Sequence, residues 1–192
     1  MLETMFHKGS GGAGVARYSN AVNCLAVSTV APAIDKLWAM PIYLKAGTLD
    51  RIGFEVTTGG GSGNKARIFL FSNKGAGSLL YPDRLLIAGT EEDGTAAAVK
   101  ETTVSYKVDD GLHWIVYTNG GGTVATVRAV AVGGLPQILG CTSTPTPITA
   151  VSKGSVTYSA TLSSLFTNGE TFPASGSYET AAMPLVWVRY SA

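Results

Sequence analysis

The two histidines are the residues best suited to bind a metal or to move a proton, and their neighbours support neither role. His7 lies in a glycine-rich N-terminal stretch, and His113 lies between Leu112 and Trp114 in an expected strand. A zinc site on a strand would need a second histidine or a carboxylate two positions along, on the same face. Positions 111 and 115 hold glycine and isoleucine. We therefore expect a packed or hydrogen-bonded His113 and assign no metal ligand.

The acidic residues form two clusters that could supply the carboxyl pair of a glycosidase. These clusters are Asp109 with Asp110, and Glu91 and Glu92 with Asp93. A working pair needs carboxyl groups roughly 5–10 Å apart across a cleft, one of them sheltered enough to stay protonated. Both clusters fall in expected turns, where acidic residues usually serve as solvated turn formers. Neither has the spacing of a calcium loop. A polysaccharide hydrolase is therefore the least supported hypothesis.

Nucleophile and phosphate-binding motifs are also missing from the sequence. No serine lies in a Gly-x-Ser-x-Gly elbow, and a Ser-His-Asp arrangement using His113 would need an Asp that the sequence does not identify. The glycine run 59–64 follows an expected strand, but no Gly-Lys-Ser/Thr element and no helix come after it. We expect it to be a flexible hairpin tip or a binding loop. The sequence predicts a protein that is not an enzyme, with no catalytic, cofactor-binding or metal residues and no cofactor.

Several aromatic residues could stack on sugars, although such residues more often fill a sheet core or a subunit interface. They are Tyr43, Tyr81, Tyr117, Tyr158, Tyr178 and Trp187.

The composition indicates a protein of short strands and tight turns that buries part of its surface in an assembly. Charged residues make up 14% of the 192 residues, against about 25% in typical soluble proteins, and there are 24 glycines. The net charge is +1 with no basic run, which disfavours a nucleic-acid partner. No apolar run approaches the roughly 18 residues of a membrane span, and the first residues lack the order of a secretory signal. We expect Cys24 and Cys141 to be buried thiols in a reducing cytoplasm, although the sequence leaves their pairing open.

Hydrophobic alternation identifies the strands that must build the core. In 50–58, Ile52, Phe54 and Val56 share one face, as expected for a half-buried strand. Segment 99–108 alternates in the same way, and Asp109-Asp110-Gly111 after it predicts a tight hairpin. Segment 112–118 is apolar at nearly every position, which predicts a central strand covered on both faces. We expect Val104 and Trp114 to join Ile52 and Phe54 on the inner faces of two packed sheets.

The remaining strands are expected between glycine, proline and asparagine turns, and no segment predicts a long amphipathic helix. Pro41 indicates an edge strand or a bulge. Segment 133–147 is expected to be a long excursion, and 162–166 a short helical turn or an apolar anchor. The expected strands are 37–44, 66–71, 79–88, 123–132, 155–160 and 184–190. The sequence therefore predicts an all-β fold, an antiparallel two-sheet sandwich that is jelly-roll-like, over residues 18–192, preceded by a flexible N-terminal arm over 1–17.

Several stretches resemble a module that recurs in tailed-bacteriophage structural proteins, in fibre and head-decoration contexts. The most specific is Asp50-Arg-Ile-Gly-Phe-Glu-Val-Thr-Thr58; the others are 37–43, 66–71, 111–114, 172–174 and 184–189. The likeness covers roughly residues 17–190. It implies a jelly-roll-like domain, no cofactor and trimeric assembly, and it brings no catalytic residues. The longer fibre members have a repetitive shaft ahead of the module, which is missing here and favours a short capsid or tail appendage.

The preferred hypothesis is a non-enzymatic virion structural protein, made in the host cytoplasm. It would be a capsid decoration or head-fibre subunit, or a short tail appendage, that contacts itself, as a homotrimer, and other virion proteins of capsid or tail. The alternative is a receptor-binding module of a tail fibre or spike that recognises host surface glycan through loops such as 59–64 and 135–147.

Overall fold

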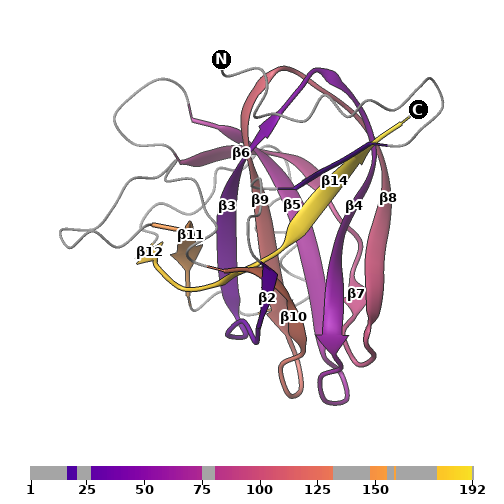
Figure 1. The fold of residues 1–192 in the computed structure, drawn as a ribbon, viewed down its shortest axis with the longest axis vertical. Helices are drawn as coiled ribbons and strands as arrows, with labels where there is room; N and C mark the ends of the chain where they lie inside the picture. Colours follow the sequence, from indigo (N-terminus) through magenta and orange to yellow (C-terminus); the bar gives the residue numbers. More distant parts are fainter. Residues whose placement is uncertain are drawn as a thin grey trace.

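The structure is a computed structural model that describes residues 17–20, 27–74, 81–131, 148–154, 158 and 177–191. Within these ranges the chain forms fourteen β-strands and no helix. The strands make two sheets of seven, and every strand pair is antiparallel. The predicted all-β, two-sheet antiparallel architecture is confirmed (Figure 1).

The first sheet is named the β4 sheet after its longest strand. Its order is β1–β14–β4–β10–β13, with β2 also pairing with β10 and β8 also pairing with β4. Its strands are β1 (Arg17–Asn20), β2 (Val27–Val30), β4 (Gly47–Thr58), β8 (Ala98–Val108), β10 (Thr126–Val130), β13 (Met183–Pro184) and β14 (Val186–Tyr190).

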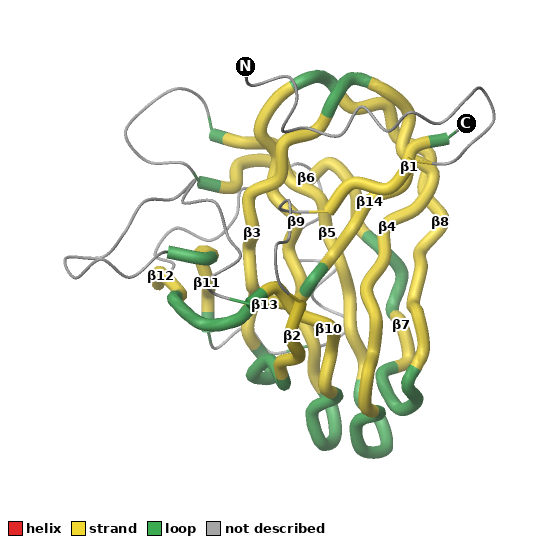
Figure 2. The backbone as a smooth tube through the Cα atoms, viewed as in Figure 1, coloured by secondary structure: helices red, strands yellow, loops and turns green. Residues whose placement is uncertain are grey.

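The second sheet is named the β9 sheet after its central strand. Its order is β12–β11–β3–β9–β5–β6, with β7 also pairing with β5. Its strands are β3 (Lys36–Leu44), β5 (Lys65–Asn73), β6 (Pro82–Ala88), β7 (Glu92–Asp93), β9 (Gly111–Gly120), β11 (Ala150–Lys153) and β12 (Ser177–Glu179). Figure 2 shows the strands of the two sheets running alongside one another, with loops at both ends of the sandwich.

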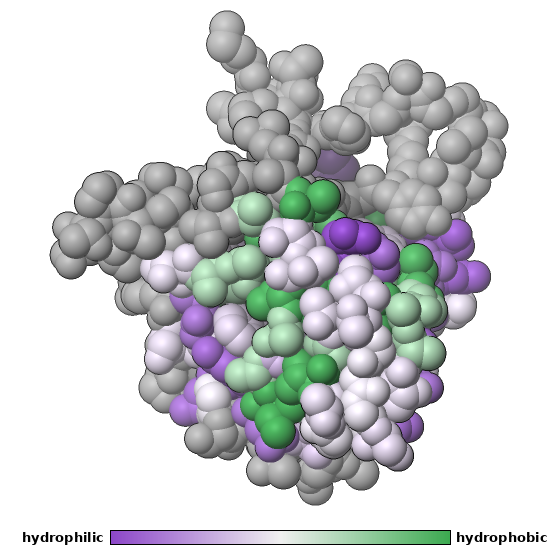
Figure 3. All heavy atoms as spheres, turned by 60° about the horizontal axis from the view of Figure 1, so that its bottom comes forward, coloured by the Kyte–Doolittle hydropathy of each residue, from purple (hydrophilic) through white to green (hydrophobic). Residues whose placement is uncertain are grey.

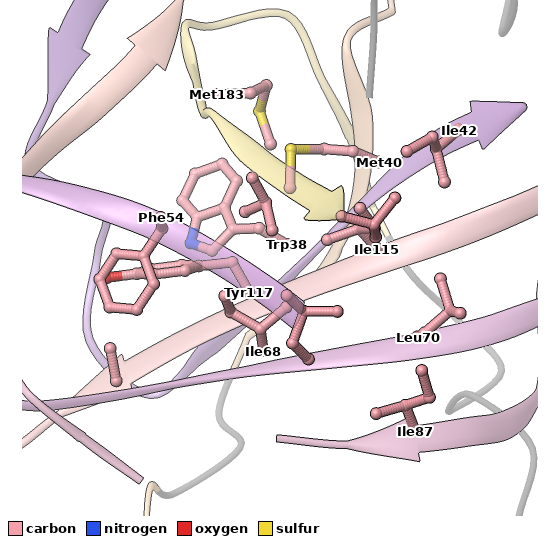
Figure 4. Close-up of a cluster of buried hydrophobic side chains, with 14 of the residues drawn as sticks. Trp38, Met40, Ile42, Phe54, Ile68, Leu70, Ile87, Ile115, Tyr117 and Met183 are labelled. Atoms are coloured by element: carbon pink, nitrogen blue, oxygen red, sulfur yellow. The ribbon is translucent and has the colours of Figure 1, made fainter. Parts of the chain in front are cut away.

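The main hydrophobic core lies between the two sheets. In β4, Ile52, Phe54 and Val56 are at most 2% exposed, as their alternation predicts. Phe54 meets Tyr117 of β9 edge to face, with ring centroids 5.3 Å apart. Figure 4 shows these two rings in contact, with side chains of both sheets around them. The contact joins the middle strands of the two layers, and it fixes how the sheets pack.

The β9 sheet is apolar on both faces, because a second hydrophobic cluster lies on its outer face. This outer cluster contains Leu37, Ala39, Phe69, Phe71, Trp114, Val116 and Val151, with Tyr81, Leu85 and Tyr158 packed against it. The prediction that 112–118 is a central strand covered on both faces is confirmed, since β9 pairs with β3 and with β5.

The prediction that Trp114 supplies an inner face is wrong. Trp114 is fully buried, but it belongs to the outer cluster, whereas its neighbour Ile115 belongs to the main core. Its Nε1 donates a hydrogen bond of 2.8 Å to Oδ1 of Asn73. A strand that is apolar at nearly every position shows no alternation, so the sequence could not tell which face of the sheet Trp114 occupies.

The prediction of a hairpin at Asp109-Asp110-Gly111 is also wrong. β8 pairs with β4 and β9 pairs with β3 and β5, so the turn carries the chain from one sheet to the other. Gly111 has φ of +147°, in the region that favours glycine. The residues therefore make a tight turn as expected, but they do not join paired strands.

Several strand bounds differ from those expected. Strands β1, β2, β7, β11 and β12 are short and were not predicted, and β13 overlaps the expected strand 184–190 only at Pro184. Pro41 pairs with Trp114 of β9, whereas β11 pairs with β3 only at residues 37–39. On the side of β3 away from β9, no described strand pairs with Pro41. Proline, which lacks an amide hydrogen, is tolerated at such an unpaired position.

Some expectations lie outside the described residues. They concern residues 1–16 of the arm, Cys24, Cys141, the expected excursion 133–147, the anchor 162–166, and the expected strand 155–160 apart from Tyr158.

Candidate functional site: the outer face and the β8 edge of the β4 sheet

His113 is packed and hydrogen-bonded, as the sequence predicts. It is 8% exposed and its Nδ1 lies 3.1 Å from the carbonyl oxygen of Gly111. Among the described residues, no group of three His, Cys, Asp or Glu side chains could hold a metal ion. No helix in the described part of the chain is long and apolar enough to cross a membrane.

The acidic cluster at 91–93 does not form a carboxyl pair across a cleft. Each of its three side chains has its own polar partners. Glu92 accepts hydrogen bonds from Thr90 and Thr102, and Asp93 accepts two from Thr95. The bonds from Thr95 hold the pKa of Asp93 below its usual value. Glu92 and Asp93 form the short strand β7, not the expected turn, and these contacts hold β7 and the turn that leads into β8.

Glu91 belongs to a charged cluster at the edge of the outer face of the β9 sheet. It forms ion pairs with Lys65 at 3.2 Å and with Arg67 at 3.7 Å. The hydroxyl of Tyr158 donates a hydrogen bond of 3.2 Å to Glu91, and burial raises the pKa of Tyr158. The Tyr158 ring covers Gly120, where a Cβ atom would come within 2.1 Å of the tyrosine Cβ. The cluster therefore anchors Tyr158 to the end of β9.

Asp110 stabilises the crossover at the opposite end of the sandwich. Its Oδ1 accepts a hydrogen bond from the backbone amide of Ala46, and Lys45 lies 3.8 Å from its Oδ2. This places the Asp110 carboxylate on the neighbouring crossover from β3 to β4. A structural role accounts for its position.

The glycine run 59–64 is part of an ordered cluster of loops at one end of the sandwich. Gly60 and Gly61 donate backbone hydrogen bonds to Gly94 and Thr123, at 2.9 and 2.8 Å. Asn64 is 1% exposed, and its Nδ2 donates to the carbonyl of Gly121 at 3.1 Å. We call residues 59–64, 94–95 and 121–123 the glycine loop cluster (Figure 1, lower end). The expected flexible tip is instead held by backbone bonds to two other loops.

Replacing Gly121 by alanine is expected to lower the free energy of unfolding by roughly 1–3 kcal/mol. Gly121 has φ of +70°, and a Cβ atom there would lie 2.3 Å from the carbonyl oxygen of Gly63. Gly154→Ala is the matched control, because a Cβ at Gly154 meets nothing within 4 Å. Urea unfolding of both variants measures the difference. Equal stability of the two variants would contradict the packing of the loop cluster.

The aromatic residues do not form one sugar-stacking platform among the described side chains. Tyr117 is 1% exposed and lies in the main core. Trp187 of β14 is partly buried, and it lies against Gly53 of β4, where a Cβ atom would come 2.8 Å from the indole Nε1. This places the Trp187 ring on the outer face of the β4 sheet. Nothing is described of the Tyr178 side chain.

Two arginine–carboxylate pairs cross the outer part of the β4 sheet. Arg189 donates to both carboxylate oxygens of Asp50 at 2.9 and 2.8 Å. Arg128 donates to both oxygens of Glu55 at 3.0 Å each. The hydrogen bonds from arginine hold the pKa values of Asp50 and Glu55 below their usual range. The two pairs join β4 to β14 and to β10 in a planar, two-bond geometry that fixes side-chain position.

These pairs predict a specific loss of stability in acid. A carboxyl group with a lowered folded pKa stabilises the protein above its unfolded pKa, and this stability is lost as the pH falls through the folded value. We expect the unfolding free energy to fall below about pH 4.5, and to fall less in Arg189→Met. Arg84→Met, at an exposed site, is the control. If the unfolding free energy fell by the same amount with pH in the unmodified protein, Arg189→Met and Arg84→Met, the expectation would be contradicted.

β8 is a long edge strand of the β4 sheet. It has 11 residues and pairs with β4 along one edge, while no described strand pairs along its other edge. Glu101, Thr103, Ser105 and Lys107 are exposed on the outer face. Val104 and Tyr106 are only partly buried against the main core. An edge of this length presents unpaired backbone groups and can pair with another strand.

The surface at the end of the molecule that carries the glycine loop cluster is neither uniformly hydrophobic nor uniformly hydrophilic. Figure 3, which brings this end of the molecule forward, shows mostly pale residues with separate green and purple areas. Two of the large exposed hydrophobic residues in the described chain, Val27 and Val99, lie on β2 and β8. The described features that remain available to a partner are therefore the β8 edge and the outer face of the β4 sheet.

No protein-family model matches this chain, and no curated protein matches its sequence.

Proposed function

We propose that the chain is a non-enzymatic structural subunit of a bacteriophage particle, located in the virion after synthesis in the host cytoplasm. It would serve as a capsid decoration or head-fibre subunit, or as a short tail appendage. It would assemble through protein contacts with itself and with other virion proteins. The observation that carries the proposal is a contrast between the residues that could perform chemistry and the edge of β8. The described candidates for chemistry are held in turns and ion pairs, while the long edge strand β8 has no second partner strand among the described residues.

The strand order supports assignment to the jelly-roll type within this proposal. Two four-stranded sets, β2–β10–β4–β8 and β3–β9–β5–β6, are present in the two sheets. The chain crosses between the sheets after β2, β3, β4, β7, β8, β9, β10 and β12, so most neighbours in a sheet are not consecutive strands. Eight strands arranged as two Greek keys give this pattern, which is common in viral capsid proteins. The sequence likeness to phage modules points the same way.

Recognition of host surface glycan is the alternative function. The glycine loop cluster could carry it, because loops on a rigid β scaffold are frequent recognition sites. However, its backbone groups already bond to one another, as in Gly60 to Gly94, and Asn64 is buried. The second expected loop, 135–147, lies outside the described residues. The structural role is therefore better supported than glycan binding.

Immunogold electron microscopy of purified phage particles tests the proposal. An antibody against the purified chain should label particles at a fixed position on head or tail, and mass spectrometry should find the chain in them. Particles that lack the chain, from a lysate that contains it, would overturn the proposal. A glycan array with the purified chain tests the alternative, and binding there without particle labelling would favour it.

A further inference from the structure

We propose that the edge of β8 that has no described partner strand pairs antiparallel with β8 of a second copy of this chain, with the two copies of Val104 opposite each other. The inference rests on the proposed function and names the contact through which the subunit joins itself. The two β4 sheets would then form one continuous sheet across a two-fold axis, which makes a dimer instead of the homotrimer that the resemblance to phage modules implies. The argument depends on the faces of β8, on its charges and on its partly buried residues.

The faces of β8 restrict the register. Thr102, Tyr106 and Val108 face inward, where they are buried or packed against the main core, whereas Glu101 and Lys107 are exposed. A two-fold axis perpendicular to the sheet places residues of the same face opposite each other. A slip by one residue would turn the core face of one copy toward solvent. The possible registers therefore differ from one another in steps of two residues.

The charges of β8 select one of these registers. With Val104 opposite Val104, Glu101 of each copy faces Lys107 of the other, and Thr103 faces Ser105. If the two-fold axis moves so that Ser105 faces Ser105, Glu101 faces Asp109, and two like charges oppose each other. If it moves to Thr103, Glu101 faces Ser105 and Lys107 faces Val99. Opposite charges and paired hydroxyls stabilise cross-strand contacts, whereas like charges destabilise them.

The single chain leaves these groups available. Among the described residues, neither Glu101 nor Lys107 forms a salt bridge. Val104 and Tyr106 remain partly exposed at the margin of the main core. Pairing would cover both and would satisfy the backbone groups of an 11-residue edge. Lysine on an edge strand can also discourage pairing, but here each Lys107 would meet a Glu101.

Complementary charge reversal tests the pairing directly. In Glu101→Lys, lysines face each other at both cross-strand positions, and in Lys107→Glu, glutamates do. Each variant alone should dimerise at least roughly tenfold more weakly than the unmodified chain. A one-to-one mixture of the two variants should dimerise again, because each cross-strand pair then joins a lysine to a glutamate. Lys74→Glu, at an exposed site outside β8, is the control and should leave association unchanged.

Sedimentation equilibrium over a range of concentrations gives the dissociation constants, and circular dichroism checks that each variant is folded. Weakening by both variants with recovery in the mixture supports the proposal. A monomeric unmodified chain, a trimer that both variants leave unchanged, or weakening without recovery would overturn it. None of these three results bears on whether the chain is found on particles. Particle labelling therefore tests the proposed function separately. If the particles were labelled but the β8 pairing failed, the subunits would assemble through another surface.

Discussion

Replacing Phe54 by alanine is expected to lower the free energy of unfolding by roughly 3–5 kcal/mol. Phe54 is fully buried in the middle of β4, and its ring meets Tyr117 of the opposite sheet. Truncation removes apolar contacts and leaves a cavity between two sheets that cannot close, because other core residues hold them apart. Such a loss is a large share of the stability of a small domain. Urea unfolding at low protein concentration measures it.

Two further variants make this result specific. Phe54→Leu keeps most of the apolar volume and should cost less than Phe54→Ala. Val27→Ala removes a side chain that is 62% exposed, and it should change stability by no more than about 0.5 kcal/mol. If Phe54→Ala and Val27→Ala were equally stable, the two-sheet core could not lie where the structure places it.

Replacing Trp114 by alanine is expected to destabilise the protein by a similar amount, roughly 3–5 kcal/mol, although Trp114 lies outside the main core. It is fully buried in the outer cluster of the β9 sheet with Phe69, Phe71 and Val116. If the outer face of the β9 sheet were open to water, Trp114→Ala would lower the free energy of unfolding far less. The experiment therefore asks whether this face is a true second core.

Trp114→Phe is the matched variant for this site. It retains a ring but removes the Nε1 donor, which leaves Oδ1 of Asn73 without its 2.8 Å hydrogen bond. We expect Trp114→Phe to cost less than Trp114→Ala, and unfolding in urea compares the two. A loss below about 1 kcal/mol in Trp114→Ala would show that the outer cluster contributes little to stability.

The local features of the sequence predicted much of the strand content. Alternation in 50–58 identified the inward residues Ile52, Phe54 and Val56, because successive side chains of a strand point to opposite faces. The same reasoning identified β8, whose expected bounds differ from the observed ones by a single residue. Short strands such as β7 and β11 were missed, since two to four residues are too few to show a period.

The candidate site was less accessible to prediction than the strands. The sequence predicted that 59–64 is a flexible hairpin tip or a binding loop, because glycine runs lack side chains that could hold a loop. The structure holds it by backbone bonds from Gly60 and Gly61 to loops far along the chain. The arginine pairs of Asp50 and Glu55 were also missed. Their partners, Arg189 and Arg128, lie 139 and 73 residues away, and no local pattern links them.

By itself, the sequence determined that the chain is all-β, that β4 and β8 each have one core face, and that β9 is central. These properties follow from residue type and a period of two, which act within a few neighbouring residues. Only the tertiary structure decided that β8 and β9 enter different sheets, that Trp114 faces outward, and that one edge of β8 has no described partner. Those outcomes depend on which distant strands pair, and strand pairing is set by contacts between residues far apart in the chain.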